Sequence, residues 1–225
     1  RGVFDRARLP ISENANPAIK ITTRKAMSGF HTIKGQTIML KIALFKDFAD
    51  TSPKTLEMSW DQFCVFRNPA HVNRFGYTNK MQLPAYSPAE FTHGAPRRSQ
   101  NVEKVHFGVF DLDRLPNAMV DDLKGRLDGL DYIFYTTWSH PTLADQGFTS
   151  AHICVRFSRP VTLDEWPKFW ALFVERFGLL QDVTTKNPNR IWFGPFAPKG
   201  TDPAKCLYEI HAGKPLDVDD LLASK

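Results

Sequence analysis

The stretch that decides the fold is VHFGVFDLDRLP, residues 105–116, an apolar run that ends in Asp111 and Asp113. Its aromatic and β-branched residues predict a buried β-strand. Side chains two positions apart on a strand face the same side, so both carboxylates are expected together at the strand end. They repel unless a cation lies between them, and Mg²⁺ or Mn²⁺ prefers such oxygen ligands. Alternatively, Asp113 starts a turn with Arg114, and Asp111 caps a helix or pairs with a lysine.

Around this strand the pattern predicts an α/β (α+β) chain. Asn117 is expected to cap a helix, and Thr162 with Glu165 has the spacing of a capping box for a second helix that Gly178 ends. From residue 105 the order strand, helix, strand, strand, helix, strand indicates a mixed β-sheet with flanking helices, of the split βαβ or RNA-recognition-like kind. Further strands are expected at 37–45, 132–138, 151–157, 190–196 and 206–211, and further helices at 58–68, opened by Ser59, and at 217–224.

Charge is unevenly distributed along the 225 residues, whose formal net charge is +5. Residues 1–110 hold 16 Lys and Arg against 8 Asp and Glu, whereas residues 111–225 hold 13 against 16. A basic half beside an acidic half suits a polyanionic partner held by one part and metal ions held by the other, although an unevenly charged solvated surface is the simpler explanation.

The cysteines and the hydropathy of the sequence argue against a disulfide-rich, a zinc-binding and a membrane protein. Cys64, Cys154 and Cys206 are far apart and form no CxxC pair, so neither a disulfide framework nor a cysteine-rich zinc site is indicated. Cys64 and His71 alone make too few zinc ligands. No apolar run of eighteen residues is present, so we expect no membrane association. A reducing, cytoplasmic location fits best.

Several other residues are candidates for binding an anionic substrate. His152 lies at the start of a predicted strand, two residues after Ser150. If the strands at 132–138 and 151–157 pair as a hairpin, His140 should lie at the same end of it as His152. Each candidate alone also fits an ordinary role, on a solvated strand or in a loop or turn. The remaining candidates are Arg97 and Arg98 in the loop before the Asp-x-Asp strand, Arg190 at the start of a later strand, and Asp182 as a third carboxylate.

The order of these motifs resembles the archaeo-eukaryotic primase superfamily, the primase-polymerases. FDLD (110–113), SAH (150–152) and QD (181–182) are similar to its three catalytic motifs. The segments YTTWSHP, RFSRPVTLDEW and NPNRIWF resemble those of plasmid- and virus-borne members of this superfamily. The resemblance covers residues 94–215, so 94–225 is expected to be the catalytic core. Residues 1–93 are expected to be a basic region of the same domain. Many members have Asp-x-Glu in the first motif, where this chain has Asp-x-Asp.

The resemblance implies a nucleotidyltransferase, a DNA primase and polymerase that acts in plasmid or virus replication. By similarity, Asp111, Asp113 and Asp182 hold two Mg²⁺ or Mn²⁺ ions. His152 and Ser150 bind the nucleoside triphosphate, with Arg190, Arg97, Arg98 and His140 as weaker candidates. The expected partners are single-stranded DNA template and primer. No P-loop motif is present, so any helicase belongs to another chain or domain.

Two other classes of function fit part of the sequence. A metal-dependent nuclease or replication initiator acting on single-stranded DNA would use the same aspartates and histidine. An initiator of the rolling-circle kind would also need a His-x-His motif, which is absent. A non-catalytic module that binds single-stranded nucleic acid would expose aromatic side chains on an open sheet, and it leaves Asp111 and Asp113 unexplained.

Overall fold

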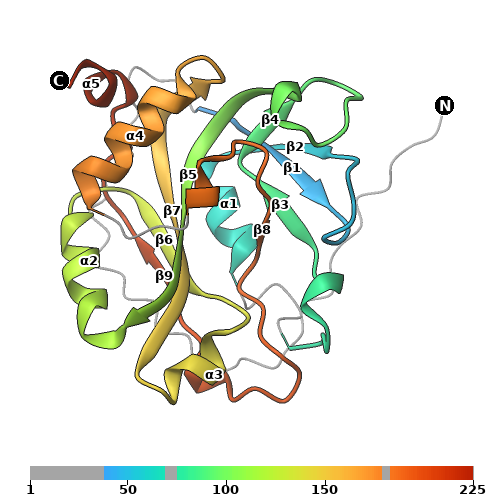
Figure 1. Ribbon diagram of the computed structural model, residues 1–225, viewed down its shortest axis with the longest axis vertical. Coiled ribbons are helices and arrows are strands. Elements are labelled where there is room, and N and C mark those ends of the chain that lie inside the picture. Colours follow the sequence, from blue (N-terminus) through green and yellow to red (C-terminus); the bar gives the residue numbers. More distant parts are fainter. Residues whose placement is uncertain (1–37, 69–74, 179–182, 225) are drawn as a thin grey trace.

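The computed structural model describes residues 38–68, 75–178 and 183–224, drawn in colour in Figure 1. The strands are β1 (Leu40–Phe45), β2 (Lys54–Met58), β3 (Ala85–Ser87), β4 (Ala89–Phe91), β5 (Val102–Pro116), β6 (Tyr132–Thr136), β7 (Phe148–Thr162), β8 (Trp192–Phe193) and β9 (Tyr208–His211). The α-helices are α1 (Trp60–Arg67), α2 (Val120–Arg126), α3 (His140–Ala144), α4 (Trp166–Phe177) and α5 (Val218–Ala223). The short turns η1 (Lys80–Gln82), η2 (Ser99–Asn101), η3 (Asn117–Met119), η4 (Val183–Lys186) and η5 (Pro203–Lys205) are 3₁₀-helical.

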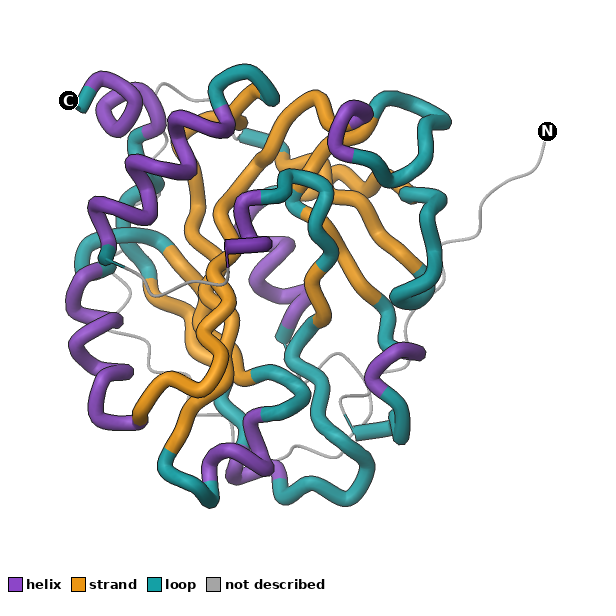
Figure 2. Tube along the Cα trace, in the orientation of Figure 1, coloured by secondary structure: helices purple, strands orange, loops and turns teal. Residues whose placement is uncertain are grey.

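Two antiparallel sheets form the centre of the molecule. One has the strand order β2-β1-β3-β8 and the other the order β4-β5-β7-β6-β9. The described part of residues 1–93 contributes strands to both, because β3 pairs with β8 and β4 pairs with β5. The long strands β5 and β7 run down the middle of Figure 1, and the helices surround the sheets in Figure 2. The α+β class expected from the sequence is therefore confirmed.

The larger sheet contains the split βαβ unit. Strands β5 and β6 are both antiparallel to β7, which lies between them, so β5 and β6 are parallel to each other without pairing. Every neighbouring pair of strands in the two sheets is antiparallel, so the mixed pairing expected from the sequence is not found among the described strands. The sequence also placed a last strand at 190–196 in this sheet, and that placement is wrong. Only β8 forms there, it joins the other sheet through β3, and β9 takes the edge beside β6.

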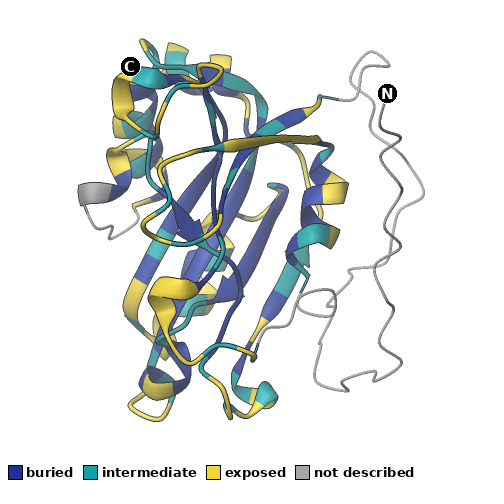
Figure 3. Ribbon diagram, turned by 90° about the vertical axis from the view of Figure 1, so that its right-hand side faces the viewer, coloured by how far each residue is buried: buried dark blue, intermediate teal, exposed yellow. Residues whose placement is uncertain are grey.

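The two faces of β5 pack against different cores. Phe110 and Leu112 face α2, α4 and α5, in a core that includes Phe169 and Phe173. Phe107 and Val109 face α1 and the smaller sheet, where Phe63, Tyr86 and Tyr135 are fully buried. Burying a side chain of this size contributes about 2–3 kcal/mol before the entropy of ordering it is counted. Figure 3 shows the buried strands enclosed by partly exposed helices.

Helix ends follow the sequence signals in part. Ser59 forms a capping box with Gln62 at the start of α1, as expected, and Gly178 ends α4 in the left-handed conformation at φ 56°. The expected box of Thr162 and Glu165 does not start α4. Thr162 still pairs with Lys104 as the end of β7, and its hydrogen bonds with Glu165 brace the turn before the helix begins at Trp166.

Asn117 does not cap a helix either, so that prediction is also wrong. Strand β5 continues to Pro116, which pairs with Phe148, and a 3₁₀ turn then leads into α2. The Asn117 side chain accepts a hydrogen bond from Thr149 Oγ1 instead, at 2.8 Å. Asn117 therefore ties the end of β5 to β7.

The remaining observations concern the cysteines and the helix lengths. All three cysteines are buried free thiols. Within the described ranges, no helix combines the length and apolar character that crossing a bilayer requires.

Candidate active site

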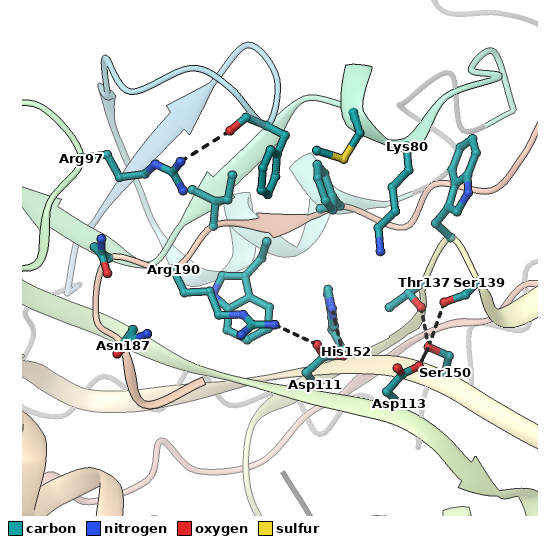
Figure 4. Close-up of a pocket in the computed structure, with 17 residues that line it drawn as sticks. Lys80, Arg97, Asp111, Asp113, Thr137, Ser139, Ser150, His152, Asn187 and Arg190 are labelled. Carbon is teal, nitrogen blue, oxygen red and sulfur yellow. Dashed lines mark hydrogen bonds and ion pairs between the residues drawn. The ribbon is translucent and has the colours of Figure 1, made fainter. Parts of the chain in front are cut away.

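One face of β5 passes from the core into a pocket. Phe107 and Val109 are buried between the sheets, and Asp111 and Asp113 continue the same face beyond them. There they border a cavity of about 520 Å³, shown in Figure 4. Its walls also include Phe48, Lys80, Met81, Arg97, Thr137, Trp138, Ser139, Ser150, His152, Asn187, Asn189, Arg190, Ile191, Trp192 and Phe193. The two carboxylates are thus brought together on one face of β5, as the sequence predicts, although the strand does not end there and continues to Pro116.

Asp111 lies between two nitrogen-bearing side chains. It is the cross-strand partner of His152, and its Oδ1 lies 3.5 Å from His152 Nε2. Its Oδ2 lies 3.4 Å from Nη2 of Arg190. Burial tends to raise the pKa of Asp111, but His152 and Arg190 outweigh it, and the pKa ends below its ordinary value. Asp111 is therefore an anion at neutral pH.

Asp113 is held by a chain of hydroxyl groups. The register of β5 against β7 shifts between Leu112 and Leu115, and Arg114 has a φ of 55° in this bulge. Ser150 Oγ donates to Asp113 Oδ1 at 3.1 Å. Because the serine has one hydroxyl proton, Thr137 Oγ1, 2.8 Å away, donates to it in turn. Bulges often re-aim side chains beside active sites, and this one follows the second carboxylate.

The opposite wall of the pocket is basic. Arg190 comes from the loop before β8 and lies over the Trp192 ring, 5.0 Å from its centroid. Arg97 donates to the Phe48 carbonyl oxygen at 3.5 Å, and burial lowers the pKa of its guanidinium. Lys80 comes from η1 and approaches the Phe193 ring. In Figure 4, Lys80 and Arg97 lie across the cavity from the carboxylates, and Arg190 reaches Asp111. The pocket can therefore hold a polyanion beside a pair of carboxylates.

The structure separates some of the predicted residues from this pocket. His140 is buried in α3, and its Nδ1 accepts a hydrogen bond from the backbone N–H of Ser150 at 3.3 Å. It therefore contacts a residue that lines the pocket and does not line the pocket itself. Arg98 is exposed at the start of η2 and does not border the cavity. Asp182 lies outside the described residues, as does His71. Asp111, Asp113, Ser150, His152, Arg97 and Arg190 are brought together.

Sequence reasoning missed other parts of the wall. Lys80 and Phe48 lie in the region that matched no motif, and only the packing of the smaller sheet brings them to the end of β5. Thr137 and Ser139 were visible in YTTWSHP, just before His140, and could have been found as hydroxyl partners of Ser150. The roles of all these residues stay predictions.

The carboxylates fit divalent metal ions by their chemistry. Asp113 is exposed and accepts one hydrogen bond, from Ser150, and the contacts of Asp111 with nitrogen are as long as 3.4 and 3.5 Å. Oxygens so placed are available to a hard cation. In the part of the chain that the structure describes, no group of three His, Cys, Asp or Glu side chains is placed to hold a metal ion. A third carboxylate ligand would have to come from outside the described residues. The resemblance implies that Asp182 supplies it.

Fold and pocket together define an α+β protein with paired carboxylates facing a basic wall. Searches against protein-family models and against curated proteins found no match. Among solved structures, the chain is similar to the AEP domain of the cyanophage S-2L primase-polymerase, with 14% identity and a TM-score of 0.49. The match covers 81% of this chain and 88% of that one.

Proposed function

We propose that the chain is a template-directed nucleotidyltransferase, a DNA primase and polymerase that works with divalent metal ions. The observation that carries this proposal is the pocket in which Asp111 and Asp113 face Lys80, Arg97 and Arg190. Nucleotidyl transfer needs carboxylates for metal ions and cations for the triphosphate, and the reaction requires both within reach of one α-phosphate.

Asp111 and Asp113 would hold Mg²⁺ or Mn²⁺, together with Asp182 by resemblance. Bound there, the ions would lower the pKa of a primer 3′-hydroxyl and stabilise the departing pyrophosphate. Ser150 holds Asp113 through its hydroxyl, which leaves the second oxygen of that carboxylate directed to the cavity. Strand alternation puts both aspartates on the pocket side of β5, and the bulge at Arg114 lies just beyond them.

The triphosphate would lie between β7 and the basic wall. His152 presents Nε2 to the cavity beside Asp111, and Arg190 presents its guanidinium on the other side of that carboxylate. A planar guanidinium can donate two hydrogen bonds to one phosphate. Lys80 and Arg97 add positive charge across the cavity. Arg190 exchanging its long contact with Asp111 for a phosphate would also free that carboxylate for a metal ion.

Template and primer would be single-stranded DNA held through its backbone phosphates. Arg98 is exposed beside the pocket residue Arg97, and the first 110 residues carry the excess of positive charge. Such contacts release counterions, so binding should depend on salt. A helicase activity, where replication requires one, would be supplied by another domain or chain.

The nuclease or replication initiator is the second candidate, since paired carboxylates can also hydrolyse a phosphodiester. The three cations on the opposite wall favour the polymerase, because a triphosphate carries more charge to neutralise than one diester does. The non-catalytic module is disfavoured, because Asp111 and Asp113 place negative charge where it would repel DNA.

A labelled-nucleotide assay separates the three candidates. The protein is incubated with single-stranded template, primed or unprimed, with Mg²⁺ or Mn²⁺ and labelled nucleoside triphosphates. The polymerase extends the primer, and a primase also makes product without one. Shortening of the DNA in the absence of nucleotides identifies a nuclease. Binding without any change to the DNA identifies the binding module, and either of these two results contradicts the proposal.

A further inference from the structure

Four side chains form one row across the larger sheet. Asp111 on β5 is the register partner of His152 on β7, His152 is the partner of Tyr135 on β6, and Tyr135 is the partner of Tyr208 on β9. All four side chains point away from α4, toward α1 and the smaller sheet. The row begins at the pocket and ends in the core, so it links a candidate substrate-binding residue to fully buried groups.

Hydrogen bonds define the direction of donation along this row. The Tyr135 hydroxyl lies 3.0 Å from the Phe193 carbonyl oxygen, which can only accept, so Tyr135 donates its single proton there. The same hydroxyl lies 3.0 Å from Nδ1 of His152. With its proton committed, Tyr135 can offer His152 only a lone pair. Nδ1 of His152 must therefore carry a hydrogen, and Nε2 is the nitrogen that faces Asp111 and the pocket.

The neighbours of Tyr135 leave this pattern intact. The Tyr86 hydroxyl lies 2.9 Å from that of Tyr135 and 3.2 Å from the Cys154 sulfur. Tyr86 can donate to the Tyr135 oxygen while accepting from the Cys154 thiol, so Tyr86 does not draw the Tyr135 proton away from Phe193. Burial raises the pKa of Tyr135 well above its usual range, which keeps its hydroxyl protonated.

We infer that Tyr135 is a positioning residue that selects the Nδ1–H tautomer of His152 and so presents Nε2 to the nucleotide-binding pocket. The Trp192 ring holds the imidazole from another side, edge to face at 5.1 Å. A neutral His152 then offers the pocket a lone pair, and an imidazolium offers it an N–H donor. In either state the atom that meets the substrate or Asp111 is Nε2.

This arrangement matters for the pocket because neutral imidazole in water mostly carries its proton on Nε2. The Tyr135 hydroxyl reverses that preference at the position where a triphosphate or a carboxylate would approach. When a histidine binds a ligand through one ring nitrogen, the group that bonds its other ring nitrogen commonly fixes the tautomer in this way. Loss of that group weakens binding or activity. That a nucleotide contacts Nε2 rests on the proposed function, whereas the assignment of the tautomer does not depend on it.

The tautomer is measured directly by ¹⁵N NMR of protein labelled at histidine. Long-range ¹H–¹⁵N spectra are recorded at a pH that leaves the ring neutral, and His152 is assigned as the signal absent from His152→Gln. The wild type should show a protonated Nδ1 and an unprotonated Nε2. A neutral His152 that carries its proton on Nε2 overturns the inference, and the only variant this result requires is His152→Gln, which serves for the assignment.

Two matched variants test the role of Tyr135. Tyr135→Phe should move the His152 signals toward the Nε2–H tautomer. Tyr208→Phe removes the next hydroxyl of the same row, which bonds the Cys64 carbonyl and not His152, and should leave them unchanged. Unchanged signals in Tyr135→Phe, or equal changes in both variants, contradict the inference.

A kinetic readout connects the tautomer to the pocket. If the chain incorporates nucleotides, Tyr135→Phe should raise the KM for the triphosphate about tenfold, because the imidazolium that donates Nε2–H to a phosphate oxygen loses the acceptor of its Nδ1–H, and Tyr208→Phe should not. An equal KM in wild type and Tyr135→Phe overturns the link to substrate binding. No incorporation by the wild type counts against the proposed function instead, and the NMR result then stands by itself.

Discussion

Asp111 and His152 face each other across neighbouring strands, with Oδ1 of one 3.5 Å from Nε2 of the other. The sequence separates them by forty residues, and the antiparallel register of β5 with β7 brings them together. This pair joins the two halves of the proposed site, since Asp111 belongs with the metal-binding carboxylates and His152 with the groups that meet the triphosphate. The following predictions extend outward from it.

The hydroxyl of Ser150 should matter through Asp113. Replacing Ser150 with Ala removes the donor to Asp113 Oδ1 and leaves Thr137 without its acceptor. We expect kcat/KM for nucleotide incorporation to fall about tenfold or more, because the carboxylate loses its orientation. Thr149→Val is the control, since it removes a hydroxyl from the neighbouring position, where Thr149 donates to Asn117. Equal activity in the two variants would show that Ser150 does not orient Asp113.

Lys80 should contribute to binding of the triphosphate, although no sequence motif indicates it. Lys80→Ala removes one of the three cations of the basic wall, and we expect KM for the nucleotide to rise about tenfold with kcat nearly unchanged. Steady-state kinetics on a primed template measures this. Lys104→Ala is a suitable control, because Lys104 is exposed on β5 and does not border the cavity. A KM that stays constant in Lys80→Ala would place the triphosphate elsewhere.

Binding to single-stranded DNA should weaken steeply with salt. Contacts between basic side chains and backbone phosphates release counterions, so the logarithm of the affinity falls linearly with the logarithm of salt concentration. Fluorescence anisotropy with a labelled oligonucleotide gives the slope, and Arg98→Ala should reduce its magnitude by about one. A flat salt response would contradict a phosphate-based contact.

Stability in acid should depend on Glu165. Hydrogen bonds from Arg159 and Thr162 lower its pKa to about 2. A lowered pKa in the folded state stabilises the protein above the pKa of the unfolded chain, near 4.5, and the contribution is lost as the pH falls toward 2. Glu165→Gln should therefore be less stable than wild type at pH 6, with the gap closing by pH 2.5. Urea unfolding across this range measures it, with the exposed Glu175→Gln as control. A gap that does not change with pH would exclude the ionic contribution.

Local patterns predicted the parts of the structure that depend on neighbours in sequence. Alternation along β5 placed Asp111 and Asp113 on one face, and Ser59 and Gly178 marked their helix ends correctly. Thr162 and Asn117 failed as helix caps because β7 continues up to Thr162 and β5 continues to Pro116, directly before Asn117. The basic wall was only partly foreseen. Lys80 reaches the pocket through packing between sheets, a long-range contact that no spacing in the sequence encodes.

The most direct measurement of the central claim is primer extension by Asp111→Asn, Asp113→Asn and the double variant. Asparagine keeps the shape of each side chain and removes the charge that a divalent ion needs. The account predicts that wild type extends a primer with Mg²⁺ or Mn²⁺, and that extension by the double variant falls by at least about a thousandfold. Asp121→Asn, on exposed α2, should retain wild-type activity. Extension by the double variant at the wild-type rate would contradict the account.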